Sequence, residues 1–192
     1  MSDALPRATL EVVLLVLVVF LVQYLALFAG LGIELFALSA PLSLYPWTIV
    51  LSVYAHAGLD HLVANVLAIL VFGTIVERNT TRARFHAFVL LTGAIAGMTE
   101  VFVGSILGPP PAVLGISGAA FALMGYVMTS NLVSRRLVGT FKLSLRAQLA
   151  IMIVLAAAIT LVTGGERVAL IAHFTGFLLG LLAGRVRLLR VQ

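Results

Sequence analysis

Ser117 has the residue type and the neighbours of a nucleophile placed at the start of a helix. It lies in the sequence GISG at residues 115–118, and no charged residue follows it as far as residue 133. Three prolines at residues 109–111 precede it, and because proline is tolerated only in the first turn of a helix, the helix begins after them. A serine hydroxyl becomes a strong nucleophile when an adjacent base takes its proton. On this short motif alone, a serine that merely packs beside a glycine is an equally good interpretation.

Histidines at residues 56, 61 and 173 are the possible bases. His173 lies in a run where small residues recur every four positions, which permits close contact with another helix. The sequence therefore favours direct contact between Ser117 and His173. His61 and Asn65 are four residues apart, so they share one helix face and could donate hydrogen bonds to a developing oxyanion, together with the Ser117 N–H. Interhelical hydrogen bonding is the alternative role for this pair, and we expect His56 to be a loop or interface histidine.

The composition indicates an all-α polytopic membrane protein. Of the 192 residues, 62% are hydrophobic and 10% are charged, whereas soluble domains have about 45–50% apolar and about 25% charged residues. The length allows one compact bundle over residues 1–192, without a separate soluble domain. The absence of cysteine excludes disulfides and thiol catalysis, and we expect no metal or cofactor. The net charge of +5 comes from residues at the ends of apolar runs, so it does not indicate nucleic-acid binding.

Six apolar runs predict six membrane-spanning helices. The segment between the first two runs is broken repeatedly by Gly and Pro, which predicts a long loop with short helical pieces in or on the outer leaflet. We expect Glu11, Gln23 and Glu100, near helix ends, to be boundary residues. The predicted helices cover about residues 10–28, 61–76, 85–103, 117–133, 147–162 and 168–186.

The positive charges predict the orientation. With six spans, both termini lie on one side, and that side holds eleven of the 12 Lys and Arg residues, with Arg167 opposite. The positive-inside bias therefore places both termini in the cytoplasm. In this orientation His61, Ser117 and His173 all lie near the outer starts of their helices. Such convergence at one depth favours chemistry over separate packing roles.

These residues resemble the rhomboid intramembrane serine proteases. The match is carried by His61-x-x-x-Asn65, by GISG with the following ALMGY at residues 122–126, and by AHFTGFLLG at residues 172–180. The resemblance spans all six predicted helices and implies a six-helix rhomboid-like bundle. It also implies that Ser117 is the nucleophile and His173 the general base and acid, in a dyad. His61, Asn65, Gly115 and Phe121 would form the oxyanion and substrate-binding site.

The resemblance also implies partners and a location. Family members cut transmembrane segments of other proteins near their outer ends, so we expect transmembrane protein substrates and a multi-pass location in the cell (plasma) membrane. The oligomeric state stays open. Two departures are Thr48, where the family often has arginine after the loop tryptophan, and Phe121, where tyrosine is common. The main alternative is a non-catalytic membrane-protein binder or chaperone on the same scaffold, and a transporter is a more distant one.

Overall fold

The computed structural model describes residues 7–130, 144–163 and 169–191, and over these residues the chain forms helices joined by loops. Leu38 and Val113 form an isolated antiparallel β-bridge, the single β-type pairing within these ranges. The basic connection near residues 135–142 and the turn at residues 164–167 lie outside the described residues. The elements are α1 (Arg7–Phe28), η1 (Ile33–Leu35), α2 (Thr48–Tyr54), α3 (Leu59–Ala68), η2 (Ile69–Gly73), α4 (Thr74–Glu77), α5 (Arg82–Leu107), α6 (Ser117–Ser130), α8 (Leu145–Thr163) and α9 (Leu170–Arg185).

Three helical segments in the described ranges are long and apolar enough to cross a bilayer: Arg7–Phe28, Leu59–Glu77 and Arg82–Leu107. In α1 only 17% of the most apolar window is buried inside the protein. Its exposed leucines and valines therefore need a lipid environment, and the protein is integral to a membrane. Helix α6 is described over 14 residues, and the residues that follow Ser130 lie outside the described range. The count of six spans stays a prediction.

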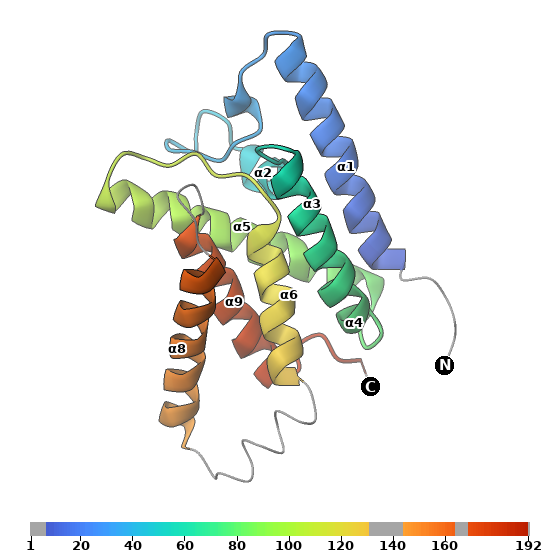
Figure 1. Cartoon of the computed structure of the whole chain (residues 1–192), viewed down its shortest axis with the longest axis vertical. Coiled ribbons are helices and arrows are strands. Elements are labelled where there is room, and N and C mark those ends of the chain that lie inside the picture. The colour runs from blue at the N-terminus through green and yellow to red at the C-terminus, as the bar shows by residue number, and fades with distance from the viewer. Residues whose placement is uncertain (1–6, 131–143, 164–168, 192) are drawn as a thin grey trace.

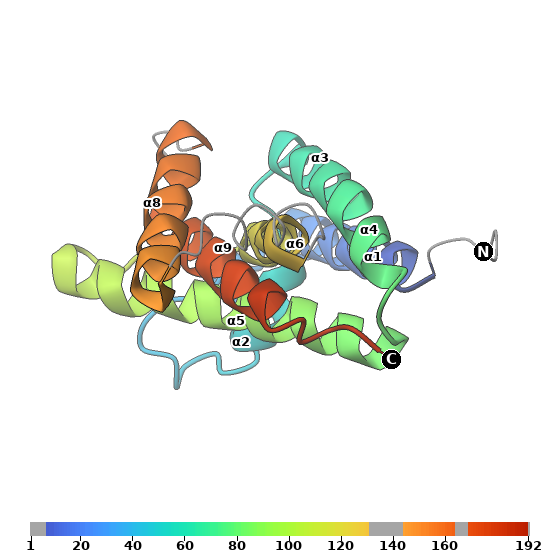
Figure 2. The same cartoon turned by 90° about the horizontal axis from the view of Figure 1, so that it is seen from below.

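Helix α6 occupies the centre of the bundle. Seen from below, α1, α3, α5 and α9 surround it, and α8 stands at the edge beside α9 (Figure 2). Helix α5 crosses behind α6 and α9 and contacts both (Figure 1). The predicted loop between the first two spans is confirmed, with η1 and α2 as its short helical pieces. This arrangement places the start of α6 between α5 and α9.

The stripe of small residues on α9 packs against α6, as the four-residue spacing predicts. A Cβ on Gly176 or Gly180 would collide with the carbonyls of Gly118 and Ala122, and one on Gly184 would come within 2.5 Å of the Tyr126 carbonyl. The backbones of the two helices therefore touch directly along this stripe. Further along, the Thr129 hydroxyl donates to the Leu181 carbonyl at 2.9 Å. These contacts fix the two helices, and any side chains on their facing turns, relative to one another.

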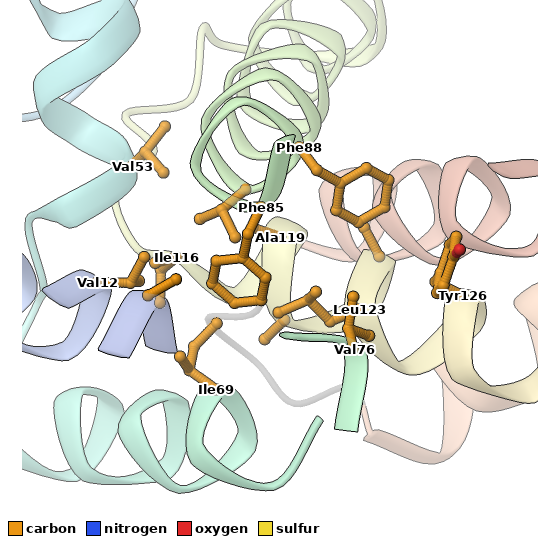
Figure 3. Packing of buried hydrophobic residues seen from close by; sticks show 14 of the residues in the cluster. Val12, Val53, Ile69, Val76, Phe85, Phe88, Ile116, Ala119, Leu123 and Tyr126 are labelled. Carbon is orange, nitrogen blue, oxygen red and sulfur yellow. The ribbon is translucent and has the colours of Figure 1, made fainter. Parts of the chain in front are cut away.

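A hydrophobic core joins α1, α3, η2, α5 and α6. Figure 3 shows Phe85 at its centre, with Ile69, Val12 and Leu123 around the ring. A second cluster joins α8 to α9 through Met152, Ala156, Phe177 and Leu181. Helix α8 thus contacts the bundle through α9, apart from the main core.

Two predicted helices differ in detail from those observed. The run at residues 61–76 forms one span, but its middle, Ile69–Gly73, is a π-helix. The wider turn lets Gly73 face α1 and α5 closely, since a Cβ there would lie 3.0 Å from the Thr9 Cγ2 and 3.2 Å from the Phe85 Cζ. Helix α5 begins earlier than predicted, because the Thr81 hydroxyl caps it by accepting a hydrogen bond from the Arg84 N–H at 3.3 Å, and it ends later, at Leu107.

Candidate active site

Ser117 and His173 are in hydrogen-bond contact. The Oγ of Ser117, the first residue of α6, lies 2.9 Å from the Nε2 of His173 in the first turn of α9. His173 is 8% exposed, and Ser117 is half-buried. The sequence predicted this contact from the small-residue stripe on α9. A hydroxyl and an imidazole at this distance can exchange a proton.

Close packing around the start of α6 fixes the position of Ser117. A Cβ on Gly118 would lie 2.6 Å from the Ala96 Cβ of α5, so the first turn of α6 touches α5 directly. The preceding loop is tied at its Gly115 N–H, which donates to the Ser52 carbonyl at 2.8 Å. Ser117 therefore cannot shift far unless the preceding loop also moves or the contact between α6 and α5 is broken.

The ring of Phe121 stacks on the imidazole of His173. Their centroids lie 4.3 Å apart with 28° between the ring planes. Phe121 is one turn after Ser117 on α6, so the same face of this helix carries the hydroxyl and the aromatic ring. The second ring nitrogen of His173, Nδ1, is buried and has no hydrogen-bond partner among the described residues. Aromatic packing, and not a second hydrogen bond, holds the imidazole there.

His61 and Asn65 line the same cavity as Ser117 and His173, as their spacing predicts. The cavity has a volume of about 910 Å³, and Phe121 and Gly115 also line it. The amide nitrogen of Asn65 donates to the His61 carbonyl at 3.0 Å, which leaves its second N–H free of that bond. The pair therefore offers the cavity one ring nitrogen and one amide hydrogen.

Gly115 has a backbone conformation that side chains rarely adopt. Its φ is +129°, and a Cβ would lie 2.6 Å from the Cε1 of His61. Both the conformation and the close approach require glycine at this position. Gly115 therefore allows the loop before α6 to pass directly beside the His61 ring.

His56 lies in a loop, as expected, and it contacts Gln23 in the interior of the protein. Gln23 is 3% exposed, and its side-chain amide binds both the His56 N–H, at 3.0 Å, and the His56 carbonyl, at 2.8 Å. His56, between α2 and α3, is fully buried, with its ring centroid 5.1 Å from that of His61. Burial lowers the pKa of His56 from 6.5 to about 4, and the nearby His61 acts in the same direction. His56 is therefore neutral and supports the position of His61.

Sequence reasoning also missed Glu100, a half-buried residue on α5. Its carboxylate accepts a hydrogen bond from the backbone N–H of Ala172 at 2.8 Å, directly before His173. Glu100 and Gln23 both bind the backbone of distant segments, so no side-chain motif marks them. Within the described ranges, no three His, Asp or Glu side chains lie close enough together to hold a metal ion.

Comparison with known proteins identifies the relatives of this chain. Residues 43–190 match the family model of the Rhomboid domain. The chain is 31% identical over 146 residues to RHOMBOID-like protein 5 of Arabidopsis thaliana, with 76% of this chain and 45% of that protein covered. It is 36% identical over 88 residues to Rhomboid protease GluP of Bacillus subtilis (strain 168), with 44% of this chain and 16% of that protein covered. The chain thus spans less than half the length of these two relatives.

Proposed function

The chain belongs to the rhomboid family, and on that premise we propose that it is an intramembrane serine endopeptidase. It cleaves transmembrane segments of other membrane proteins near the outer membrane face, with Ser117 and His173 as a catalytic dyad. The observation that carries this proposal is the 2.9 Å contact between the Ser117 Oγ and the His173 Nε2. Rhomboid protease GluP, to which part of the chain is similar, is named as a protease and supports the same activity.

In the proposed reaction, the His173 Nε2 accepts the Ser117 hydroxyl proton as Oγ attacks the carbonyl carbon of the scissile peptide bond. The tetrahedral intermediate collapses when His173 returns this proton to the leaving amine, and an acyl-serine ester remains. A water molecule then attacks the ester with His173 as base, which releases the carboxylic acid and restores the hydroxyl. The stacked Phe121 ring keeps the imidazole aligned through both steps.

The oxyanion of the intermediate has three potential donors: the His61 ring, the Asn65 amide and the Ser117 backbone N–H. The Ala120 N–H bonds to the Ile116 carbonyl at 2.9 Å, so the N–H groups before it, including that of Ser117, have no partner inside the helix. A helix N-terminus also favours developing negative charge. These groups stabilise the intermediate without a metal ion or a cofactor.

The proposed membrane is the plasma membrane, with both termini in the cytoplasm and the dyad in the outer half. The charge distribution of the sequence supports this orientation. Because the chain has no cysteine, single cysteines can be placed at Leu107, the exposed end of α5, and at Ser144, the exposed residue before α8. An impermeant thiol reagent should label intact cells at Leu107→Cys and not at Ser144→Cys. The opposite labelling pattern would reverse the orientation and place the dyad in the inner half.

The alternative function is a non-catalytic membrane-protein binder on the same scaffold. The names of the Arabidopsis relatives, RHOMBOID-like protein 5 and RHOMBOID-like protein 6, mitochondrial, state no protease activity. A binder needs neither a competent nucleophile nor a base, whereas the contact between Ser117 and His173 provides both. This observation favours the protease.

A fluorophosphonate probe tests the proposal, because it reacts covalently with an activated serine. The purified protein in liposomes should be labelled, while Ser117→Ala should not be labelled and His173→Ala only weakly. The wild type should also cleave at least one member of a panel of transmembrane substrates. A well-folded wild type that neither reacts with the probe nor cleaves any substrate would favour the binder.

A further inference from the structure

Helix α9, which carries His173, begins without a capping side chain of its own. Its N-cap residue is Ala169, which makes no side-chain hydrogen bond to the helix. The first backbone N–H groups of a helix have no intrahelical partners, and an N-cap side chain normally accepts a bond from the second or third of them. Alanine cannot accept such a bond. The first turn of α9 therefore needs an acceptor from elsewhere.

Glu100 of α5 provides that acceptor. Its Oε2 lies 2.8 Å from the N–H of Ala172, the third residue of α9, which is the position that an N-cap side chain would bind. A carboxylate also interacts favourably with the positive end of the helix dipole. We propose that Glu100 is a positioning residue that caps α9 from α5 and thereby fixes His173 relative to Ser117. This inference rests on the proposed protease function.

The capped turn is the turn that carries the proposed base. The His173 N–H makes the first hydrogen bond inside α9, to the Ala169 carbonyl at 3.0 Å. The imidazole itself has one hydrogen-bond partner, the Ser117 hydroxyl, because its Nδ1 has none among the described residues. The orientation of the ring therefore depends on packing and on where the backbone of this turn lies. Glu100 holds that backbone at the residue before His173.

Helix α5 locates both members of the dyad. Ala96 contacts Gly118 beside the nucleophile, and Glu100, four residues later on the same face, binds Ala172 beside the base. Helix α5 contacts both α6 and α9 (Figure 2). Helix α5 therefore helps to fix the distance between Ser117 and His173, because it contacts the backbone beside each of them. A role for Glu100 as the acidic third member of a triad does not fit this geometry, because its carboxylate binds a backbone N–H and not the imidazole.

Two substitutions of similar length separate the hydrogen bond from mere space filling. Glu100→Gln keeps a side-chain oxygen that can accept from Ala172, whereas Glu100→Met fills the same space and accepts nothing. We expect Glu100→Gln to keep kcat within about threefold of the wild type. Glu100→Met should lower kcat at least about tenfold with little change in KM, because a misplacement of about 1 Å can cost about 10²-fold in rate. Fluorophosphonate labelling of Ser117 should slow in parallel.

The matched control is Glu77, which caps another helix in the same way. Its carboxylate accepts from the N–H groups of Ala8 and Thr9 at the start of α1, at 2.7 and 3.0 Å, far in sequence from the dyad. Glu77→Met should lower the melting temperature at least as much as Glu100→Met does, while its kcat, measured well below the melting temperature, stays near that of the wild type. Equal losses of kcat in the two Met variants would show a general stability effect and overturn the inference.

A second-site substitution tests capping directly. Ala169→Ser introduces an N-cap hydroxyl on α9 itself, and we expect it to raise the kcat of Glu100→Met at least about threefold. A loss of kcat in Glu100→Met that Ala169→Ser does not reverse would overturn the capping role, as would equal kcat values for Glu100→Met and Glu100→Gln. If the wild type neither labels nor cleaves, the protease proposal fails by itself. Hydrogen exchange of the Ala172 amide then still tests whether Glu100 caps α9. If it does, exchange should be faster in Glu100→Met than in Glu100→Gln.

Discussion

The imidazole of His173 stacks on the ring of Phe121, with centroids 4.3 Å apart and ring planes inclined by 28°. Phe121 also meets the Phe177 ring edge-on at 6.5 Å, so α6 and α9 together determine where the imidazole lies. Sequence spacing predicted the stacking from the four-residue separation between Ser117 and Phe121. In the proposed mechanism this aromatic contact takes over the orienting role that a carboxylate has in a catalytic triad.

Substitutions at Phe121 test that role. Phe121→Tyr keeps the aromatic face and should retain most of the turnover. Phe121→Ala removes a contact worth about 0.5–1.5 kcal/mol, so kcat should fall roughly two- to twelvefold, and the fluorophosphonate probe should label Ser117 more slowly. Turnover of one transmembrane substrate in liposomes measures the difference. Equal kcat values for the wild type and both variants would assign Phe121 to packing alone.

Substitution of the two proposed oxyanion donors, His61 and Asn65, should lower kcat, and most strongly when both are replaced. Removing one such donor costs about 10²–10³ in kcat in other serine hydrolases. The single variants His61→Ala and Asn65→Ala can each lose less kcat than this, because the remaining side-chain donor and the Ser117 N–H still bind the oxyanion. The double variant should lose at least about 10²-fold, with KM little changed and Ser117 still labelled by the probe. An unchanged kcat in the double variant would show that both residues serve only in packing and do not bind the oxyanion.

Gly115→Ala should disturb the site through His61. Its φ of +129° strains any side chain, and the added Cβ would lie 2.6 Å from the His61 ring. We expect about 1–3 kcal/mol of destabilisation and a fall in kcat at least as large as that of His61→Ala. Gly108 is the matched control, since an added Cβ meets nothing within 4 Å there and its backbone is extended. A Gly115→Ala protein as active and as stable as Gly108→Ala would contradict the close approach.

The buried His56 predicts a pH dependence of stability. Its folded pKa is about 4 against 6.5 unfolded, so the unfolded chain binds a proton between these values and the folded protein does not. Stability from neutral His56 is therefore fully present above about pH 6.5 and falls as the pH drops towards about 4, by up to about 1.4 kcal/mol per pH unit. His56→Gln should remove this part of the acid sensitivity. Melting temperatures of both proteins between pH 7 and pH 4 measure it, and parallel curves would disprove it.

Much of the fold and of the candidate site follows from local sequence patterns. Apolar runs locate the helices because a bilayer requires continuous apolar segments, and the residues after the prolines at 109–111 locate the start of α6. The faces of His61 and Asn65 follow from helical periodicity. These features depend on residues close together in the chain, so the sequence alone is sufficient for them.

Other features depend on contacts between distant segments. Gln23 binds the His56 backbone across 33 residues, and Glu100 binds the Ala172 N–H across 72. Their partners are backbone groups, which every residue has, so nothing in the sequence identifies them. The π-helix at Ile69–Gly73 likewise accompanies the packing of Gly73 against two other helices. Such features become visible only when the tertiary structure brings the segments together.

The last prediction is that the proposed catalytic unit is a dyad without an acidic third member. A triad acid must lie within hydrogen-bond distance, about 2.7–3.2 Å, of the free imidazole nitrogen. Among the described residues nothing bonds to the His173 Nδ1, and the Glu100 carboxylate binds the Ala172 N–H. Glu34 and Asp60 are exposed. Glu166 lies outside the described residues, so substitution must test it directly.

We therefore expect Ser117→Ala and His173→Ala to abolish cleavage, while single carboxamide substitutions keep most of the wild-type turnover. A buried carboxylate beside the dyad would have to lose its hydration in a membrane, where a charge costs about 2.5–3.5 kcal/mol at the centre of a helix on insertion scales. The measurement is the turnover of one transmembrane substrate in liposomes, with the fold of each variant checked by its melting temperature. One well-folded carboxamide variant as inactive as Ser117→Ala would identify a triad acid and overturn the dyad. The carboxamide variants are Glu34→Gln, Asp60→Asn, Glu100→Gln and Glu166→Gln.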